Sequence, residues 1–331
     1  MPVTNPVIAG DALARGLKNQ FDNQWRRRYD GILDSLGRVM ELGIPSTLIT
    51  ELYGYYETAP YPQRRAYDDE VQSRPFRARN FEVENFSWDL SIFWKQEDRI
   101  FDQLRGLERQ ARQGGENFAT LSERVFFQFI TGTADAQLLQ AIPNTPDGAA
   151  MYSALDGAGV DRFFVTGGNI LTGSGIATPQ AIRSDLFDGL ERIAQFQDTE
   201  GQPAIDPGMI DRGVTIYFNV ANLEVFREAF IQGVTIGSAG VAAGVTNVIL
   251  DSGMRIRLIP TQRITDDDWF IFLEDFDPRP VFQQLARPLT ETVEVEENSD
   301  NARRTKQEGI FWNSIMGFGL NLPLPTVQIN N

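Results

Sequence analysis

Three consecutive aspartates, Asp266 to Asp268, are the residues of this sequence that most suggest chemistry. Carboxylate oxygens are the ligands that Mg²⁺ prefers, so the run could serve a metal-dependent phosphoryl-transfer enzyme. Adjacent side chains of a strand point to opposite faces, however, and no second acidic motif accompanies a phosphate-binding loop. We favour a solvated turn that leads into the aromatic strand "WFIFLED" at 269–275. We therefore predict no metal-binding residue here.

The sequence also lacks the residues that the other common catalytic arrangements require. The chain contains no histidine and no cysteine, which removes the commonest general base, thiolate chemistry and the Ser/His/Asp arrangement. The glycine-rich passages at 165–177 and 237–244 contain neither GxGxxG nor a GK[ST] ending, and they lack the GxSxG spacing of a nucleophile elbow. We predict no catalytic residue, no cofactor-binding residue and no cofactor, and we expect the protein not to be an enzyme.

A basic and aromatic cluster, "SRPFRARNF" at 73–81, could stack on nucleic acid. The formal net charge of the chain is -15, which repels phosphate, so we interpret the cluster as a contact between subunits. Packaged or free DNA is expected to be touched only non-specifically. No apolar run approaches the roughly 20 residues that cross a bilayer, and nothing near Met1 resembles a signal peptide, so we expect no membrane partner.

Periodic patterns predict the elements that carry these segments. Apolar residues at helical spacing predict helices at 11–40, 96–113, 116–131 and 182–193, with Gly114 and Gly115 separating the second from the third. Buried or alternating patterns predict strands at 214–220, 245–260, 269–275, 290–296 and 309–322, and Asn222 is a predicted N-cap. Without alternating strand and helix units, the class is α+β and not a doubly wound dinucleotide fold.

Two segments are expected to bury little apolar surface within a single chain. Residues 43–69 contain three prolines and five tyrosines and predict an extended arm. Residues 72–94 alternate in polarity, with the parity changing near Glu84 and Asn85, and predict a long two-stranded ribbon. Such a ribbon is unstable alone in water. Both segments are expected to pack on neighbouring copies of the chain.

The order of several short motifs resembles that of one family. These motifs are "IPS" at 44–46, then Glu51, Tyr53, Pro60 and Arg64, "NFEVENFSWDLSI" at 80–92, "PDGAAMYSA" at 146–154, "DDDWFIFLED" at 266–275, "RPVFQQLARPLTE" at 279–291 and "GFGL" at 317–320. Together they resemble the major head subunit of phage Mu and its prophage relatives. The resemblance extends over nearly the whole chain, and the order of the motifs is its specific part.

This resemblance implies the Hong Kong 97 type capsid fold. It implies an N-terminal arm at about 1–65, an extended loop at about 66–96 and a peripheral domain at 97–212, whose spine helix runs through Phe118 to Ile130. An axial domain would occupy 213–276, and 277–331 would complete the peripheral domain. The function implied is that of a major capsid protein of a tailed bacteriophage. It would assemble through hexamers and pentamers into an icosahedral shell around double-stranded DNA.

The resemblance also implies the partners and the place of action. The main partner would be the chain itself, with portal, scaffold and decoration proteins as further candidates, and the protein would act in the virion after assembly in the host cytoplasm. Some shells of this fold link a lysine of the extended loop covalently to a neighbour. Here the only lysine of that segment is Lys95, at its very end, so we predict a non-covalent shell. No long helix precedes the arm, so any scaffold should be a separate protein.

Other functions remain open on the sequence. An encapsulin-type compartment shell would keep the fold but needs a cargo-binding groove, which the sequence does not identify. Another virion or tail component of mixed α+β structure is the second alternative. The third is the phosphoryl-transfer enzyme at Asp266 to Asp268, which a dependence of the melting temperature on Mg²⁺ or Ca²⁺ would distinguish.

Overall fold

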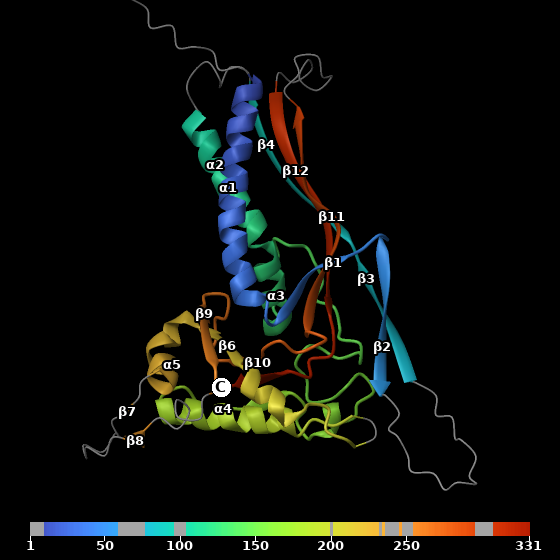
Figure 1. Ribbon diagram of the computed structural model, residues 1–331, viewed down its shortest axis with the longest axis vertical. Helices are drawn as coiled ribbons and strands as arrows, with labels where there is room; N and C mark the ends of the chain where they lie inside the picture. The colour runs from blue at the N-terminus through green and yellow to red at the C-terminus, as the bar shows by residue number, and fades with distance from the viewer. Residues whose placement is uncertain are drawn as a thin grey trace, which may run out of the picture.

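The computed structural model describes residues 10–58, 77–95, 104–198, 201–231, 234–235, 245–246, 254–294 and 307–331. An elongated upper part and a rounder lower part are visible in Figure 1. The helices are α1 (Gly10–Leu36), α2 (Leu104–Ala119), α3 (Leu121–Thr131), α4 (Pro179–Ala194) and α5 (Leu223–Phe230). None of the helices in these ranges is long and apolar enough to cross a membrane.

The upper part is a sheet of four strands in the order β1-β11-β12-β4. Its members are β1 (Met40–Pro45), β11 (Val281–Glu294), β12 (Gln307–Leu320) and β4 (Phe86–Lys95). Helices α1 and α2 run together along one face of this sheet, as Figure 1 shows. Phe21 of α1 stacks on Trp312 of β12 with ring centroids 4.2 Å apart, so an aromatic pair fixes the helices to the sheet.

The lower part is a sheet of five strands in the order β5-β13-β10-β6-β9. Its members are β5 (Ile170–Thr172), β13 (Thr326–Asn330), β10 (Trp269–Leu273), β6 (Val214–Asn219) and β9 (Ile256–Thr261). Helices α4 and α5 pack on it through a buried cluster that includes Leu186, Phe226 and Ile271. The predicted helix at 182–193 and the predicted strands at 214–220 and 269–275 are thus confirmed.

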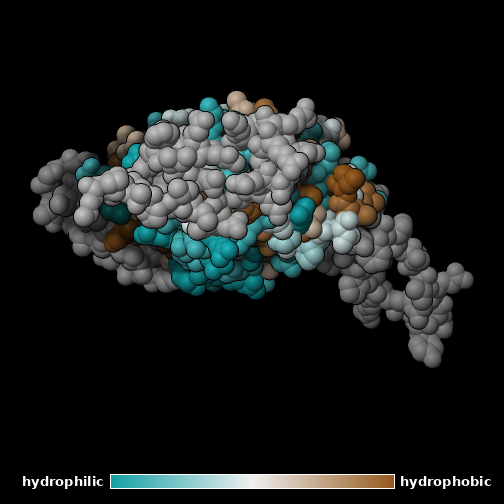
Figure 2. Space-filling view, turned by 90° about the horizontal axis from the view of Figure 1, so that it is seen from above, coloured by the Kyte–Doolittle hydropathy of each residue, from teal (hydrophilic) through white to brown (hydrophobic). Residues whose placement is uncertain are grey.

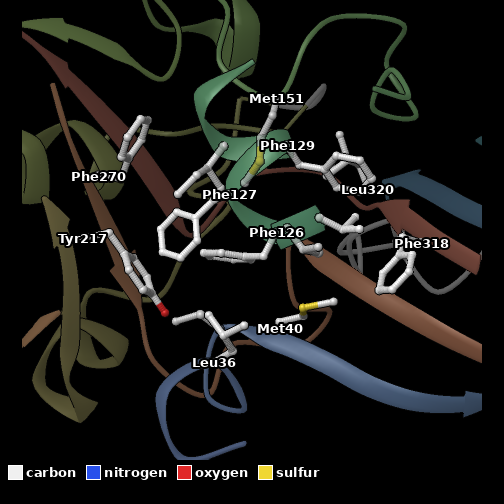
Figure 3. Close-up of a cluster of buried hydrophobic side chains, with 14 of the residues drawn as sticks. Leu36, Met40, Phe126, Phe127, Phe129, Met151, Tyr217, Phe270, Phe318 and Leu320 are labelled. Atoms are coloured by element: carbon white, nitrogen blue, oxygen red, sulfur yellow. The ribbon is translucent and has the colours of Figure 1, made fainter. Parts of the chain in front are cut away.

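Helix α3 lies where the two sheets meet. Figure 3 shows Phe126, Phe127 and Phe129 of this helix between side chains of both parts of the molecule. Tyr217 of β6 contacts Phe126 and also donates a hydrogen bond to the Ser35 carbonyl at 3.1 Å. The core is therefore continuous across the junction, and α3 accounts for the larger part of the helix predicted at 116–131.

Two smaller pairs of strands complete the description. Strands β2 (Thr50–Thr58) and β3 (Arg77–Glu84) form an antiparallel ribbon that leaves the side of the long sheet (Figure 1). Strands β7 (Val234–Thr235) and β8 (Val245–Thr246) form a short pair beyond α5. The middle of the predicted strand at 245–260 lies outside the described residues.

The predicted ribbon at 72–94 is wrong in its pairing. Strands β3 and β4 follow one another with a break at Asn85, but β3 pairs with β2 and β4 pairs with β12. Alternation of apolar and polar residues indicates which face of a strand is buried, but it does not indicate which strand it pairs with. The ribbon therefore begins within the segment expected to be an extended arm. In that segment, 43–45 belong to β1, and 59–69 lie outside the described residues.

The predicted helix break at Gly114 and Gly115 is also wrong, because both glycines lie inside α2 and the break falls at Thr120. A Cβ at Gly115 would lie 2.5 Å from the Phe21 carbonyl oxygen, and one at Gly114 would lie 2.9 Å from Leu90 Cδ2. The glycines therefore let α2 approach α1 and β4 closely. They serve packing and not chain reversal.

The segment 213–276, expected to be an axial domain, does not complete a sheet by itself. The segment 213–276 contains β6, β9 and β10, but β5 and β13 belong to the same sheet and come from 170–172 and 326–330. Helix α4 packs on that sheet as well. The end of the chain thus joins the same sheet as the segment 213–276, although the resemblance implied that all of 277–331 belongs to the peripheral domain.

Candidate functional site

The three aspartates lie in the turn between β9 and β10. Asp268 accepts hydrogen bonds from Gln328 Nε2 at 2.7 Å and from the Asn331 backbone N–H at 3.0 Å. Asp267 Oδ1 accepts one from Asn222 Nδ2 at 3.2 Å. Burial and the nearby Asp268 raise the pKa of Asp266. Within the described ranges, no group of three or more Asp or Glu side chains is placed to hold a metal ion. The carboxylates of Asp267 and Asp268 instead bind the turn to Asn222, before α5, and to β13.

Asn222 occupies the N-cap position of α5 as predicted, but its side chain does not cap the helix. The side chain that caps a turn here is that of Asn219, which accepts a hydrogen bond from the Ala221 N–H at 3.0 Å. Of the two glycine-rich passages, 165–177 contains β5, which pairs with β13 and has turns on either side, and 237–244 lies outside the described residues.

A network of polar side chains joins the β2–β3 ribbon to the long sheet, and we call it the ribbon base: Ser46, Glu51, Tyr53, Asn85 and Gln284. Asn85 Nδ2 donates to Ser46 Oγ at 2.6 Å and to the Leu48 carbonyl at 2.7 Å. Gln284 Nε2 donates to Asn85 Oδ1 and to the Val83 carbonyl, both at 3.0 Å. Tyr53 donates its hydroxyl proton to Gln284 Oε1 at 2.8 Å.

Glu51 closes the turn at 46–50. Its Oε1 accepts hydrogen bonds from Ser46 Oγ at 2.9 Å, from the Thr47 N–H at 2.8 Å and from the Leu48 N–H at 3.2 Å. Hydrogen bonds to the charged form favour it, and the bonds from Thr47, Ser46 and Leu48 lower the pKa of Glu51. At neutral pH this carboxylate therefore keeps the turn closed without a cation.

Close packing supports the same junction. A Cβ at Gly317 would lie 2.5 Å from the Glu84 carbonyl oxygen, and one at Gly319 would lie 2.5 Å from the Phe282 ring. Tyr53 stacks on Phe81 with centroids 5.5 Å apart, and both rings meet Phe282 edge-on. Only glycine at these two positions of β12 lets the ribbon approach so closely.

The ribbon base unites residues from motifs that are far apart in the sequence. The segments 44–46, 80–92, 279–291 and 317–320 all contribute to it, together with Glu51 and Tyr53. Pro60 and Arg64 lie outside the described residues. Sequence reasoning found these motifs but missed that Asn85 and Gln284 bond to one another, since their separation of 199 residues carries no local signal.

A second buried network belongs to the motif at 146–154. Arg162 has a relative exposure of 1% and donates to Asp147 Oδ2 at 2.7 Å and to Thr145 Oγ1 at 2.6 Å. It also donates to the carbonyls of Ala150 and Met151, each at 2.8 Å. Burial lowers the pKa of this guanidinium, and the carboxylate of Asp147 opposes that shift. The buried positive charge is therefore paired with a negative one. Sequence reasoning missed Arg162 altogether.

Apolar side chains are exposed beside the ribbon base. Leu48, Ile49 and Leu52 have relative exposures of 59%, 77% and 61%. Figure 2 shows brown, hydrophobic atoms on the right side of the molecule, which is the side of the ribbon in Figure 1. Clustered apolar exposure of this kind is typical of an interaction surface. The arrangement can hold a projecting ribbon rigidly and offer a surface for docking.

Two searches of known sequences found nothing: no family model matches the chain, and no curated protein matches it. Solved structures do match, with a probability of 1.00. "Capsid structure of the Cyanophage P-SCSP1u" has a TM-score of 0.57 at 9% identity and covers 89% of this chain and 87% of the other. "Asymmetric unit of bacteriophage PhiM1 mature capsid" has a TM-score of 0.52 at 13% identity and covers 88% and 85%.

A third solved structure, "Capsid of native GTA particle computed with C5 symmetry", has a TM-score of 0.54 at 9% identity and covers 90% of each chain. At such low identities a likeness establishes the fold. The chain has the Hong Kong 97 type fold of phage capsid proteins, and the expected α+β class is confirmed. The likeness covers 88 to 90% of this chain, so it concerns most of the architecture.

Proposed function

We propose that this protein is the major capsid protein of a tailed bacteriophage. It assembles with copies of itself, through hexamers and pentamers, into an icosahedral shell around double-stranded DNA. The observation that carries the proposal is the likeness to three phage or phage-like capsid structures at TM-scores above 0.5, over nearly the full length of each chain. The order of the motifs that resemble the phage Mu head subunit supports the same function.

The anatomy of the ribbon supports self-assembly. Two strands form a ribbon that leaves the sheet, and its contacts with the rest of the described chain are concentrated at the ribbon base. A two-stranded ribbon is marginally stable in water, so a neighbouring copy is the natural support for its length. Obligate interfaces of such assemblies commonly bury roughly 2,000 to 5,000 Å².

The proposal assigns parts of the chain to parts of the capsid fold. The β2–β3 ribbon is the extended loop, at about 50–84 instead of 66–96. The long sheet with α1, α2 and α3 is the peripheral domain. The five-stranded sheet with α4 and α5 is the axial domain, at about 132–276 together with 321–331.

We propose a shell held without covalent links between subunits. Lys95 is at the end of β4, opposite Gln307 of β12, and is not part of the β2–β3 ribbon. A denaturing gel of purified particles should therefore show one band near 37.2 kDa, and a ladder of multiples would contradict this. The virion would be the final location, after assembly in the host cytoplasm, with portal, scaffold and decoration proteins as separate partners.

Expression of the chain alone, followed by negative-stain microscopy and mass measurement, tests the proposal. Closed shells, hexamers or pentamers are the expected result. Shells that enclose a specific protein cargo instead of DNA would favour the encapsulin-type alternative. A monomer at every concentration, with a melting temperature that rises with Mg²⁺, would contradict the capsid function and favour an enzyme at Asp266 to Asp268.

A further inference from the structure

A cavity with charged walls lies where the upper and lower parts of the molecule meet. Its volume is about 370 Å³, which is in the range of pockets that hold small ligands. It is lined by Asp34 and Arg38 near the end of α1, by Arg255, Ile256 and Arg257 at the start of β9, and by Glu274 after β10. Figure 1 shows the lower end of α1 beside β9. Three guanidinium groups therefore face one space.

Alternation along β9 brings two of these groups to the same face. Ile256 packs on the core with α4 and α5, whereas Ile259 packs on the core around α3. Arg255 and Arg257 have the parity of Ile259, so both side chains stand on the face toward α1. Arg257 Nη2 lies 2.9 Å from Asp34 Oδ2 of α1, in agreement with this direction.

The carboxylates that line the cavity are already paired with two of the guanidinium groups. Glu274, which is 4% exposed, accepts hydrogen bonds from Arg38 Nη1 and from Thr215 Oγ1, both at 2.7 Å, so each of its oxygens has a partner. The Asp34 side chain is 81% exposed and pairs with Arg257. A surface ion pair of this kind contributes little, so Asp34 can be displaced by a better partner of Arg257.

Arg255 adds a positive charge that the described residues do not compensate. Its guanidinium has no hydrogen bond and no ion pair within the described ranges, although the chain has 45 acidic side chains against 30 basic ones. Asp275 also lies near Arg38, but its carboxylate is 3.9 Å from Arg279. Like charges around one cavity repel each other, and an anion between them would relieve this repulsion.

The number and placement of the guanidinium groups indicate the kind of anion. A carboxylate has two oxygens and typically forms a bidentate pair with a single guanidinium. A tetrahedral oxyanion has further oxygens that point away from the first pair and can accept from other donors. Arg255 and Arg257 approach from one wall and Arg38 lies on the other, so acceptors in several directions match them better than a carboxylate does.

We propose that the cavity between α1 and β9 binds a phosphate group, and that Arg255 is the residue that contributes most to its affinity. The phosphate would come from the free ion or from the backbone of enclosed DNA, and the second source rests on the proposed function. The formal net charge of -15 repels DNA in general, so a local site at Arg255 would give DNA one defined contact. A bound phosphate would also join α1 to β9.

Thermal unfolding in different sodium salts at equal ionic strength tests the site, because a ligand that binds only the folded chain raises the melting temperature. Phosphate or sulfate at about 50 mM should raise the midpoint by about 2 to 4 °C relative to chloride, and acetate should not. Arg255→Gln removes no side-chain contact within the described ranges and should abolish most of this rise. Arg109→Gln, at an exposed position of α2, is the matched control and should keep it.

The comparison between variants carries the test, because phosphate and sulfate also stabilise folded proteins in general by exclusion from their surface. That general effect is the same for all three proteins. An equal rise in wild type, Arg255→Gln and Arg109→Gln, or no rise in any of them, would overturn the site and leave the capsid function intact. A chain that never assembles would instead overturn the capsid function, since the salt comparison needs no shell.

A short DNA duplex in place of the salts identifies the source of the phosphate once the ions have shown the expected difference. A rise in the midpoint that Arg255→Gln loses assigns the site to the DNA backbone. A response to the ions alone assigns it to free phosphate. All proteins are compared in the same assembly state, because association also raises apparent stability.

Discussion

Three glycines of helix α2 allow one substitution to be compared in three settings. A Cβ at Gly106 would meet nothing within 4 Å, one at Gly114 would meet only the flexible end of Leu90 at 2.9 Å, and one at Gly115 would meet the Phe21 backbone at 2.5 Å. Glycine in a helix interior costs about 1 kcal/mol relative to alanine. Gly106→Ala should therefore raise the free energy of unfolding by up to about 1 kcal/mol.

The other two substitutions add a steric term to the same gain. At Gly114 the Leu90 side chain can move, so Gly114→Ala should be close to neutral. At Gly115 the obstacle is backbone, and overpacking of this kind costs typically about 1 to 3 kcal/mol, or more where nothing can move. We expect Gly115→Ala to lower the free energy of unfolding by about 2 kcal/mol as α1 and α2 are pushed apart.

Thermal unfolding of the purified variants measures this order. The midpoint should be highest for Gly106→Ala, similar for Gly114→Ala and wild type, and lowest for Gly115→Ala. All four proteins must be compared in the same assembly state, because association raises apparent stability. A Gly115→Ala midpoint at or above that of wild type would refute the close approach of α2 to α1.

Three further predictions concern the polar networks. Arg162→Ala should lower the free energy of unfolding by about 3 to 5 kcal/mol in urea titrations, because it leaves Asp147 without its buried partner, whereas Arg109→Ala, at an exposed position of α2, should change it by less than about 1 kcal/mol. Tyr53→Phe leaves the buried Gln284 Oε1 without its donor, so hydrogen exchange in the β2–β3 ribbon should accelerate, by a factor set by about 1 to 3 kcal/mol; an unchanged rate would contradict this. The lowered pKa of Glu51 means that its stabilisation is complete above its ordinary pKa of 4.5 and is lost as the pH falls through the lowered value. Amide exchange at Thr47 and Leu48, corrected for the intrinsic rate, should therefore increase in acid, and much less so in Glu51→Gln.

Local patterns in the sequence predicted local structure well. The apolar spacing of Ile182, Leu186, Leu190 and Ile193 gave α4, since helical periodicity and burial on one face are the same property. The uniformly apolar run around Phe270 gave the fully buried β10. The order of the motifs also predicted the capsid fold, which the solved structures confirm.

Partners distant in sequence were not predictable in the same way. The alternation around Trp88 is equally compatible with pairing of β4 to β3 or to β12. In the structure β4 pairs with β12. Gly115 was interpreted as a helix breaker because propensity does not reveal that another helix approaches it. The ribbon base was missed as a site because its amides act only through contacts between the β3–β4 break, β11 and the turn at 46–50.

The most direct test of the central claim is microscopy of the purified full-length chain, combined with mass measurement of any particles. The capsid proposal predicts closed icosahedral shells, or free hexamers and pentamers, whose mass is a multiple of 37.2 kDa. A monodisperse monomer over the whole concentration range would contradict it.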